Sequence, residues 1–231
     1  MKNRNEYIII ITVLLSISSC RSNNYKSQGD ADYGKQISKS LSYINNYYFK
    51  KSPIYLDSAL QILKSIENKS LRYNNIILGD EVHAYFLKKD FSNAYSTLNR
   101  IPDSIFPFPE FKKVYEFKIR AKEAETNGNK KKQKESFRSI ILIYQKYLDD
   151  NQQTVETILR QSDMNIIKHS PNIDFVISEM FFYKSKIQSM NKVISEIDSF
   201  KKINKGNSLY FDELKKKIKS KDAKIIGILL Y

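Results

Sequence analysis

The chain is poor in residues that interrupt regular structure and in residues that cross-link it. Its 231 residues include only 6 Gly, 5 Pro, one Cys and two His, and no Trp. A sandwich or barrel of many short strands needs a turn every few residues, so this composition favours long helices instead. A lone Cys also excludes an internal disulfide, so we expect a fold that is stable without cross-links.

Acidic residues are also scarce relative to basic ones. Lys and Arg number 39 against 25 Asp and Glu, which gives a net charge of +14. The basic residues are mostly Lys and are spread along the chain, with no Arg-rich block and no recognisable nucleic-acid module. We therefore predict no nucleic-acid partner, and expect the lysines to face anionic lipid headgroups or polyanionic glycans.

The first twenty residues have the three-part pattern of an export signal. Lys2 and Arg4 give a basic start, and residues 7–15 form an apolar run. This run is too short to cross a bilayer, which needs about 20 apolar residues, but it has the length of a signal-peptide core. Small residues follow it, and the sequence Ile-Ser-Ser over 17–19 ends on Cys20.

This ending resembles the lipobox of bacterial lipoproteins, in which the cysteine becomes the acylated N-terminus after cleavage. The resemblance implies a signal peptide over 1–19 and a lipid on Cys20 that ties the chain to a membrane. The polar segment 20–34 is predicted to be a flexible tether. Arg21 stands where an inner-membrane lipoprotein often carries Asp, so we expect the outer membrane, facing the periplasm.

Beyond the tether, apolar residues recur at helical spacing. Helices are expected over 37–48, 56–66, 77–88 and 91–101. Two of them share a pattern, because Leu56, Ala59, Leu63 and Ile66 match the residues Phe91, Ala94, Leu98 and Ile101. The two patterns lie 35 positions apart, which indicates an internal repeat.

The repeat resembles the tetratricopeptide family, whose helix pairs recur about every 34 residues. The best match covers 78–101, where Leu78 and Tyr85 fit the first helix. Lys89 departs from the family pattern, since it stands at the turn glycine. The resemblance implies an all-α fold of antiparallel helical hairpins stacked as a short solenoid over 35–150, with a concave binding surface.

A C-terminal helical extension is expected over 151–231. It should contain a helix over 155–167, a long helix from Ile173 to Lys202 and a short basic helix over 209–218. The apolar end, 225–231, fits a last strand, a packed helix end or the stub of a membrane segment equally well, and is far too short to span a bilayer.

No catalytic or metal-binding constellation stands out. His83 lacks a second His at helical spacing, and Cys20 is assigned to the lipid, so we predict no metal, no cofactor and no enzymatic activity. The side chains expected to face a binding groove are Asn74, Asn75, Asp80 and His83.

The sequence therefore predicts a lipid-anchored scaffold of the cell envelope that binds a protein or peptide through helical repeats. Two alternatives stay open at this point. One is a lipoprotein that captures a glycan or nutrient, and the other is a shortened membrane sensor, which the apolar end at 225–231 suggests.

Overall fold

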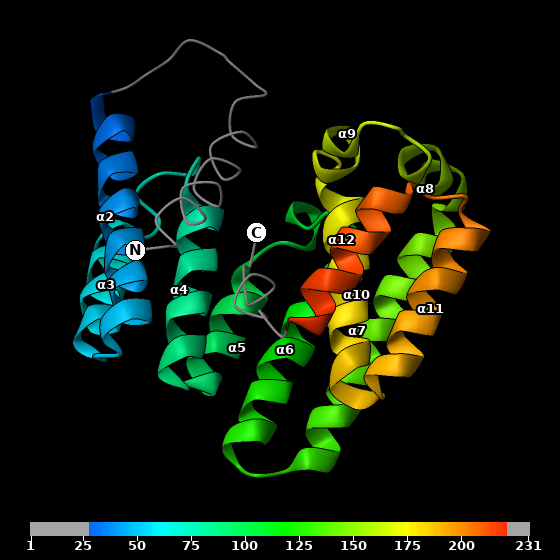
Figure 1. Cartoon of the computed structure of the whole chain (residues 1–231). Helices are drawn as coiled ribbons and strands as arrows, with labels where there is room; N and C mark the ends of the chain where they lie inside the picture. Colours follow the sequence, from blue (N-terminus) through cyan, green and yellow to red (C-terminus); the bar gives the residue numbers. More distant parts are fainter. Residues whose placement is uncertain (1–27, 221–231) are drawn as a thin grey trace. The chain divides into compact units, whose positions relative to one another are not determined.

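The computed structural model describes residues 28–220, and every regular element within that range is a helix. The predicted all-α class is confirmed for this part of the chain (Figure 1). The helices, in order, are α2 (Gln28–Lys50), α3 (Ile54–Ile66), α4 (Asn74–Lys88), α5 (Phe91–Arg100), the 3-10 turn η1 (Asp103–Ile105), α6 (Phe111–Thr126), α7 (Lys130–Asp150), α8 (Gln152–Leu159), α9 (Met164–Lys168), α10 (Pro171–Ile187), α11 (Met190–Ile203) and α12 (Ser208–Lys219).

The described helices belong to two compact units that divide within α4, between Asp80 and Glu81. The expected boundary after residue 150 lies inside the second unit, where α10 packs against α7. In the N-terminal unit, α2 and α3 pack along each other. Its core joins Ile37 of α2, Leu63 and Ile66 of α3, and Ile77 of α4.

The two segments with the matching repeat pattern are helical except for Ile101, which follows the end of α5. Their matched positions are buried except for Phe91, which is half-buried. Ala59 in α3 and Ala94 in α5 have no exposed surface, which lets neighbouring elements approach closely. The turn between α4 and α5 is formed by Lys89 and Asp90. Lys89 has φ 63°, the left-handed conformation in which glycine is usual, and Asp90 caps α5 by accepting a hydrogen bond from the Asn93 N–H.

The second unit is organised around α6, α7 and α10. Helix α7 packs against both of the others, and aromatic rings fill the space between them. Phe111 and Phe175 have ring centroids 5.9 Å apart, and Tyr144 meets Phe175 edge to face at 6.3 Å. Burial of such large rings supplies much of the stability of a small helical unit without cross-links.

One charged pair lies inside this aromatic core. Lys118 of α6 is 6% exposed and Glu179 of α10 is 1% exposed, and the Lys118 Nζ lies 2.7 Å from the Glu179 Oε2. The Tyr144 hydroxyl of α7 donates a hydrogen bond to the same carboxylate. All three helices are therefore joined at one carboxylate.

The expected long helix from Ile173 to Lys202 is wrong, because the chain forms α10 and α11 instead. Gln188 and Ser189 have extended backbone conformations, with ψ of 165° and 147°, and these end one helix and begin the next. The reversal lets α11 pack against α10 (Figure 1) and bury Val193 and Ile197 completely. The periodicity of the apolar residues was the same in both helices and so did not reveal the break.

Three other boundaries can be compared with the structure. The helix expected over 155–167 is divided into α8 and α9, whereas the short basic helix over 209–218 is confirmed as α12. Helix α2 begins at Gln28, so residues 28–34 of the expected tether are helical. The expected signal peptide, Cys20 and the end at 225–231 lie outside the described residues. No helix within 28–220 has the length and apolar character needed to cross a bilayer.

Replacing Glu179 should destabilise the second unit strongly. A Glu179→Leu variant leaves the Lys118 ammonium buried without its carboxylate, and we expect the free energy of unfolding to fall by about 3–5 kcal/mol. The triple variant Lys118→Met, Glu179→Leu, Tyr144→Phe removes every polar partner and should recover most of that loss. Urea denaturation followed by circular dichroism measures both. Equal stability of the single and triple variants would contradict this account of the buried pair.

Candidate functional site

A groove of about 820 Å³ lies across α5, α6 and α7 in the second unit. Its floor is one face of α6, and its walls come from Tyr95 and Asn99 of α5 and from the first turns of α7. The lining is mixed, with charged, amide and hydroxyl side chains beside the ring of Phe117. Such a lining suits a ligand that is itself polar and charged.

The floor of the groove has a stripe of alternating charge. Glu116, Arg120 and Glu123 lie on one face of α6 because they are four and three residues apart, and all three line the groove. Their spacing permits ion pairs within the helix, yet none forms. Arg120 instead places its guanidinium over the Phe117 ring, 5.3 Å from the centroid. The Glu116 and Glu123 carboxylates therefore face the groove without an ion-pair partner among the described residues.

Tyr95 stands at the wall of the groove with its hydroxyl closed off from solvent and close to the Arg120 side chain. Burial is the main cause that raises the pKa of Tyr95 to about 12, and the Glu123 carboxylate adds to it, although nearby Arg120 acts in the opposite direction. The hydroxyl therefore stays protonated near neutral pH.

The α7 wall is held in place by its own turn. Gly128 adopts the left-handed conformation, with φ 68°, and reverses the chain between α6 and α7. Asn129 then caps α7, as its side-chain oxygen accepts a hydrogen bond from the Lys132 N–H at 3.0 Å. Ser136, which is also buried, donates to the Lys132 carbonyl. The wall is therefore fixed by local hydrogen bonds.

The opposite face of α6 carries the buried pair. Lys118 and Arg120 are two residues apart, so they point to nearly opposite sides of the helix. The Lys118 ammonium lies 5.2 Å from the Tyr115 centroid and 5.4 Å from that of Phe175. Burial, together with the charge of Glu179, raises the pKa of Tyr144 well above its usual range, so this hydroxyl remains a hydrogen-bond donor. The cluster lies away from solvent and positions α6.

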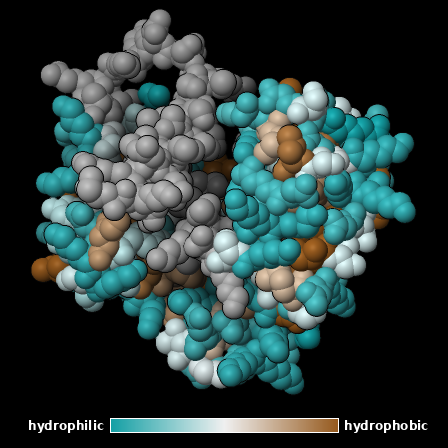
Figure 2. All heavy atoms as spheres, viewed as in Figure 1, coloured by the Kyte–Doolittle hydropathy of each residue, from teal (hydrophilic) through white to brown (hydrophobic). Residues whose placement is uncertain are grey.

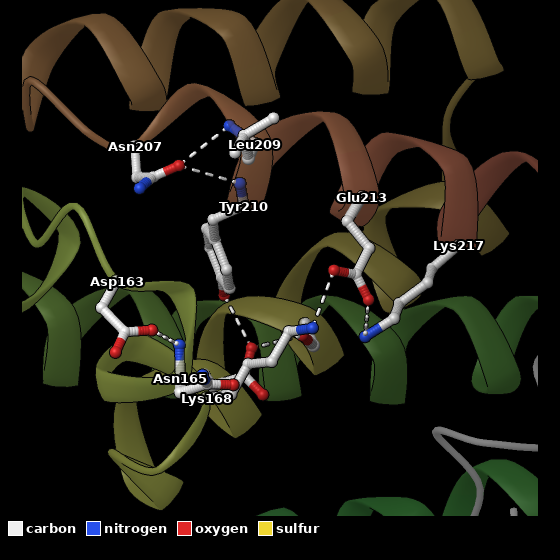
Figure 3. A network of polar contacts seen from close by, with 10 residues as sticks. Asp163, Asn165, Lys168, Asn207, Leu209, Tyr210, Glu213 and Lys217 are labelled. Atoms are coloured by element: carbon white, nitrogen blue, oxygen red, sulfur yellow. Dashed lines mark hydrogen bonds and ion pairs between the residues drawn. The ribbon is translucent and has the colours of Figure 1, made fainter.

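A second polar network joins α9, α10 and α12 (Figure 3). The Tyr210 hydroxyl donates to the Asp174 carboxylate at 2.8 Å, and Lys168 and Lys217 both pair with Glu213. Burial raises the pKa of Asp174, although the hydrogen bond from Tyr210 opposes this. These contacts link three helices, and each of the named side chains pairs with another member of the network.

The structure places the four residues expected to face a groove along α4. Asn74 and Asn75 are half-buried, and the Asn74 side-chain oxygen accepts a hydrogen bond from the Asn68 N–H at 3.1 Å. Asp80 is fully buried and His83 is 3% exposed. None of the four lines the groove on α5, α6 and α7. Cys20 lies outside the described residues.

Sequence reasoning overlooked the groove residues of α6. The spacing of Glu116, Arg120 and Glu123 was visible in the sequence, but a stripe of alternating charge is also typical of an ordinary solvated helix face. Within residues 28–220, no group of three or more His, Cys, Asp or Glu side chains is arranged to hold a metal ion.

No protein-family model, no curated protein and no solved structure matches this chain.

Acidification should destabilise the fold through His83. Burial lowers the pKa of His83 from 6.5 to about 4, so the unfolded chain binds a proton more readily between these values. The stabilising contribution is complete above pH 6.5 and is lost as the pH falls towards 4, by about 3 kcal/mol in total.

The free energy of unfolding, measured by urea denaturation at several pH values from 7 to 4, tests this. His83→Gln should flatten the decline. His169→Gln is the matched control, because His169 is exposed at the end of α9, and should leave the decline unchanged. A decline that is the same in both variants would rule out His83 as its cause.

Proposed function

We propose that this chain is a lipid-anchored scaffold of the bacterial cell envelope that binds a segment of another protein in the groove of α5, α6 and α7. The observation that carries the proposal is the set of charged side chains on the groove floor that have no ion-pair partner within the described residues. The role is binding and not catalysis.

The charges of the groove define the partner segment. Glu116 and Glu123 are suited to lysine or arginine side chains, and Arg120 to a carboxylate or to backbone carbonyl oxygens. The Tyr95 hydroxyl offers one further donor at the wall. A peptide of mixed charge meets all of these groups, and a groove of about 820 Å³ has room for several residues.

Within this scaffold the helix pairs stack as tetratricopeptide-like repeats. Two observations support this arrangement. Most of the matched positions of α3 and α5 are buried, with Leu63 and Leu98 fully so, whereas Phe91 is half-buried. Lys89 also adopts the left-handed turn conformation at the position where the repeat family has glycine. In such a stack, each hairpin buries its apolar face against the next.

The anchor is a diacylglycerol on Cys20, at the outer membrane and facing the periplasm. The support is the sequence of the first twenty-one residues, in which an apolar run of signal-peptide length ends on small residues and Cys20, with Arg21 after it. One acyl chain holds a protein only marginally, so the several chains of a lipoprotein are needed for a firm anchor.

Mass spectrometry of the protein purified from a bacterial host tests the anchor. We expect a chain that begins at Cys20 and carries a mass increment of acyl groups, and that partitions into the detergent phase of Triton X-114. The Cys20→Ala variant should lose the increment and move to the aqueous phase. An unmodified Cys20 in the wild-type protein would refute the anchor.

Site-specific photo-crosslinking in living cells tests the groove. A photoreactive amino acid in place of Asn99, at the groove wall, should capture one protein partner. The same group in place of Leu142, which is 69% exposed and does not line the groove, should capture much less. Reversing two charges with Glu116→Lys and Glu123→Lys should reduce capture at position 99 at least about tenfold.

The charge-matched control is Asp149→Lys with Asp150→Lys at the end of α7, because both residues are exposed and neither lines the groove. It should reduce capture less than the α6 pair does. Equal capture at positions 99 and 142, or capture that does not respond to the α6 reversal, would contradict binding in the groove. Loss of binding to a glycan array upon the same reversal would instead favour glycan capture.

A further inference from the structure

The turn between α11 and α12 is unusually well fixed. Helix α11 ends in a double hydrogen-bonded cap, in which the Gly206 N–H donates to the Lys201 carbonyl and the Lys205 N–H donates to the Lys202 carbonyl. Lys205 takes the left-handed conformation, with φ 48°, that this cap requires. Asn204 is buried and its side-chain amide donates to the Phe200 carbonyl at 2.8 Å.

Contacts to other elements hold the same turn from two sides. The Asn207 N–H donates to the Leu159 carbonyl at 2.7 Å, and the Asn207 side-chain amide donates to the Gln161 carbonyl at 2.8 Å. The Asn207 side-chain oxygen caps α12 (Figure 3). A Cβ at Gly206 would lie 2.3 Å from the buried Phe211 ring, so the backbone approaches that ring as closely as only glycine permits.

This fixed turn presents apolar and cationic side chains to solvent. Ile203 and Leu209, on either side of it, are 64% and 66% exposed. Lys202 and Lys205 are also exposed, and neither forms an ion pair with any residue in 28–220. In Figure 2, hydrophobic side chains lie among hydrophilic ones over the part of the surface formed by α10 and α12.

Exposed apolar side chains usually point to a partner when they are clustered and held in place. The turn residues line neither the groove of α5, α6 and α7 nor the pocket beside α12. Apolar side chains flanked by lysines are typical of surfaces that dip into the headgroup region of a bilayer, where the cations meet lipid phosphates. The net charge of +14 favours such a surface.

We propose that the α11–α12 turn is a membrane-contact site, at which Ile203 and Leu209 enter the interface of an anionic phospholipid bilayer while Lys202 and Lys205 bind its phosphates. This contact is separate from the lipid on Cys20 and from the groove. Its effect is to hold the second unit against the membrane by a defined end.

The absence of tryptophan from the chain permits a direct test. A Leu209→Trp variant of the full chain carries one indole at the turn, and Leu142→Trp carries one on α7 at a position that is 69% exposed. Each is reconstituted into vesicles of phosphatidylglycerol and phosphatidylethanolamine, or of phosphatidylcholine alone, that contain lipids brominated on their acyl chains. Bromine quenches only an indole that reaches the acyl region.

We expect strong quenching for Leu209→Trp in the anionic vesicles, at least about threefold more than for Leu142→Trp, and little for either variant in phosphatidylcholine. Adding Lys202→Glu and Lys205→Glu should abolish the difference. The matched control, Lys130→Glu with Lys131→Glu, changes the net charge by the same amount at exposed lysines of α7. It should preserve the difference in quenching between the two indoles. Circular dichroism confirms that each variant is folded.

Equal quenching of the two indoles would overturn the proposal. It would also be overturned if the two pairs of lysine reversals reduced the quenching of Leu209→Trp equally, because that result indicates only diffuse electrostatic attraction. The anchor affects both indoles alike, so an unacylated Cys20 leaves this comparison valid. The groove is tested separately, because crosslinking at position 99 should survive the reversal at Lys202 and Lys205.

Discussion

The arrangement of the second unit depends on the burial of one ion pair. Lys118 of α6 and Glu179 of α10 are 61 residues apart in the sequence, and both are removed from water. The desolvation cost of such a pair is high, so each charge needs the other and the Tyr144 hydroxyl in the right position. This requirement restricts how α6, α7 and α10 can pack, because any packing that separated the pair would leave a buried charge without its partner.

The groove follows from that restriction. Because Lys118 turns one side of α6 towards α10, the side that carries Glu116, Arg120 and Glu123 is left facing outward between α5 and α7. The Phe111 ring of α6 also packs against Tyr144 of α7 and Phe175 of α10, which fixes the same helix further. A binding surface on the outer side of α6 is therefore supported by a rigid inner side, which keeps the ordering cost of binding low.

The proposed anchor, groove and membrane-contact turn divide three tasks among separate parts of the chain. A lipid on Cys20 would keep the protein at the bilayer, the α11–α12 turn would orient the second unit, and the groove would remain open to a partner. The groove is formed by α5, α6 and α7, whereas the turn joins α11 and α12. Each surface can therefore be altered without the other.

The helical class and most helix positions follow from the amino-acid sequence, because apolar spacing and helix-breaking residues act locally. The buried faces at Ala59 and Ala94 were evident from their period, and Lys89 was correctly placed at a turn. The lipobox pattern ending at Cys20 is likewise a purely local signal, and it remains a prediction from the sequence.

Which polar residues of the second unit are buried and which face the groove depends on long-range packing. Lys118 and Arg120 look alike in the sequence, yet one is buried against Glu179 and the other faces the groove. The break at Ser189 was not visible in the sequence either, because the apolar residues of α10 and α11 follow the same helical spacing on both sides of it. Helical periodicity records which face is apolar, whereas the partner of that face is set by long-range packing.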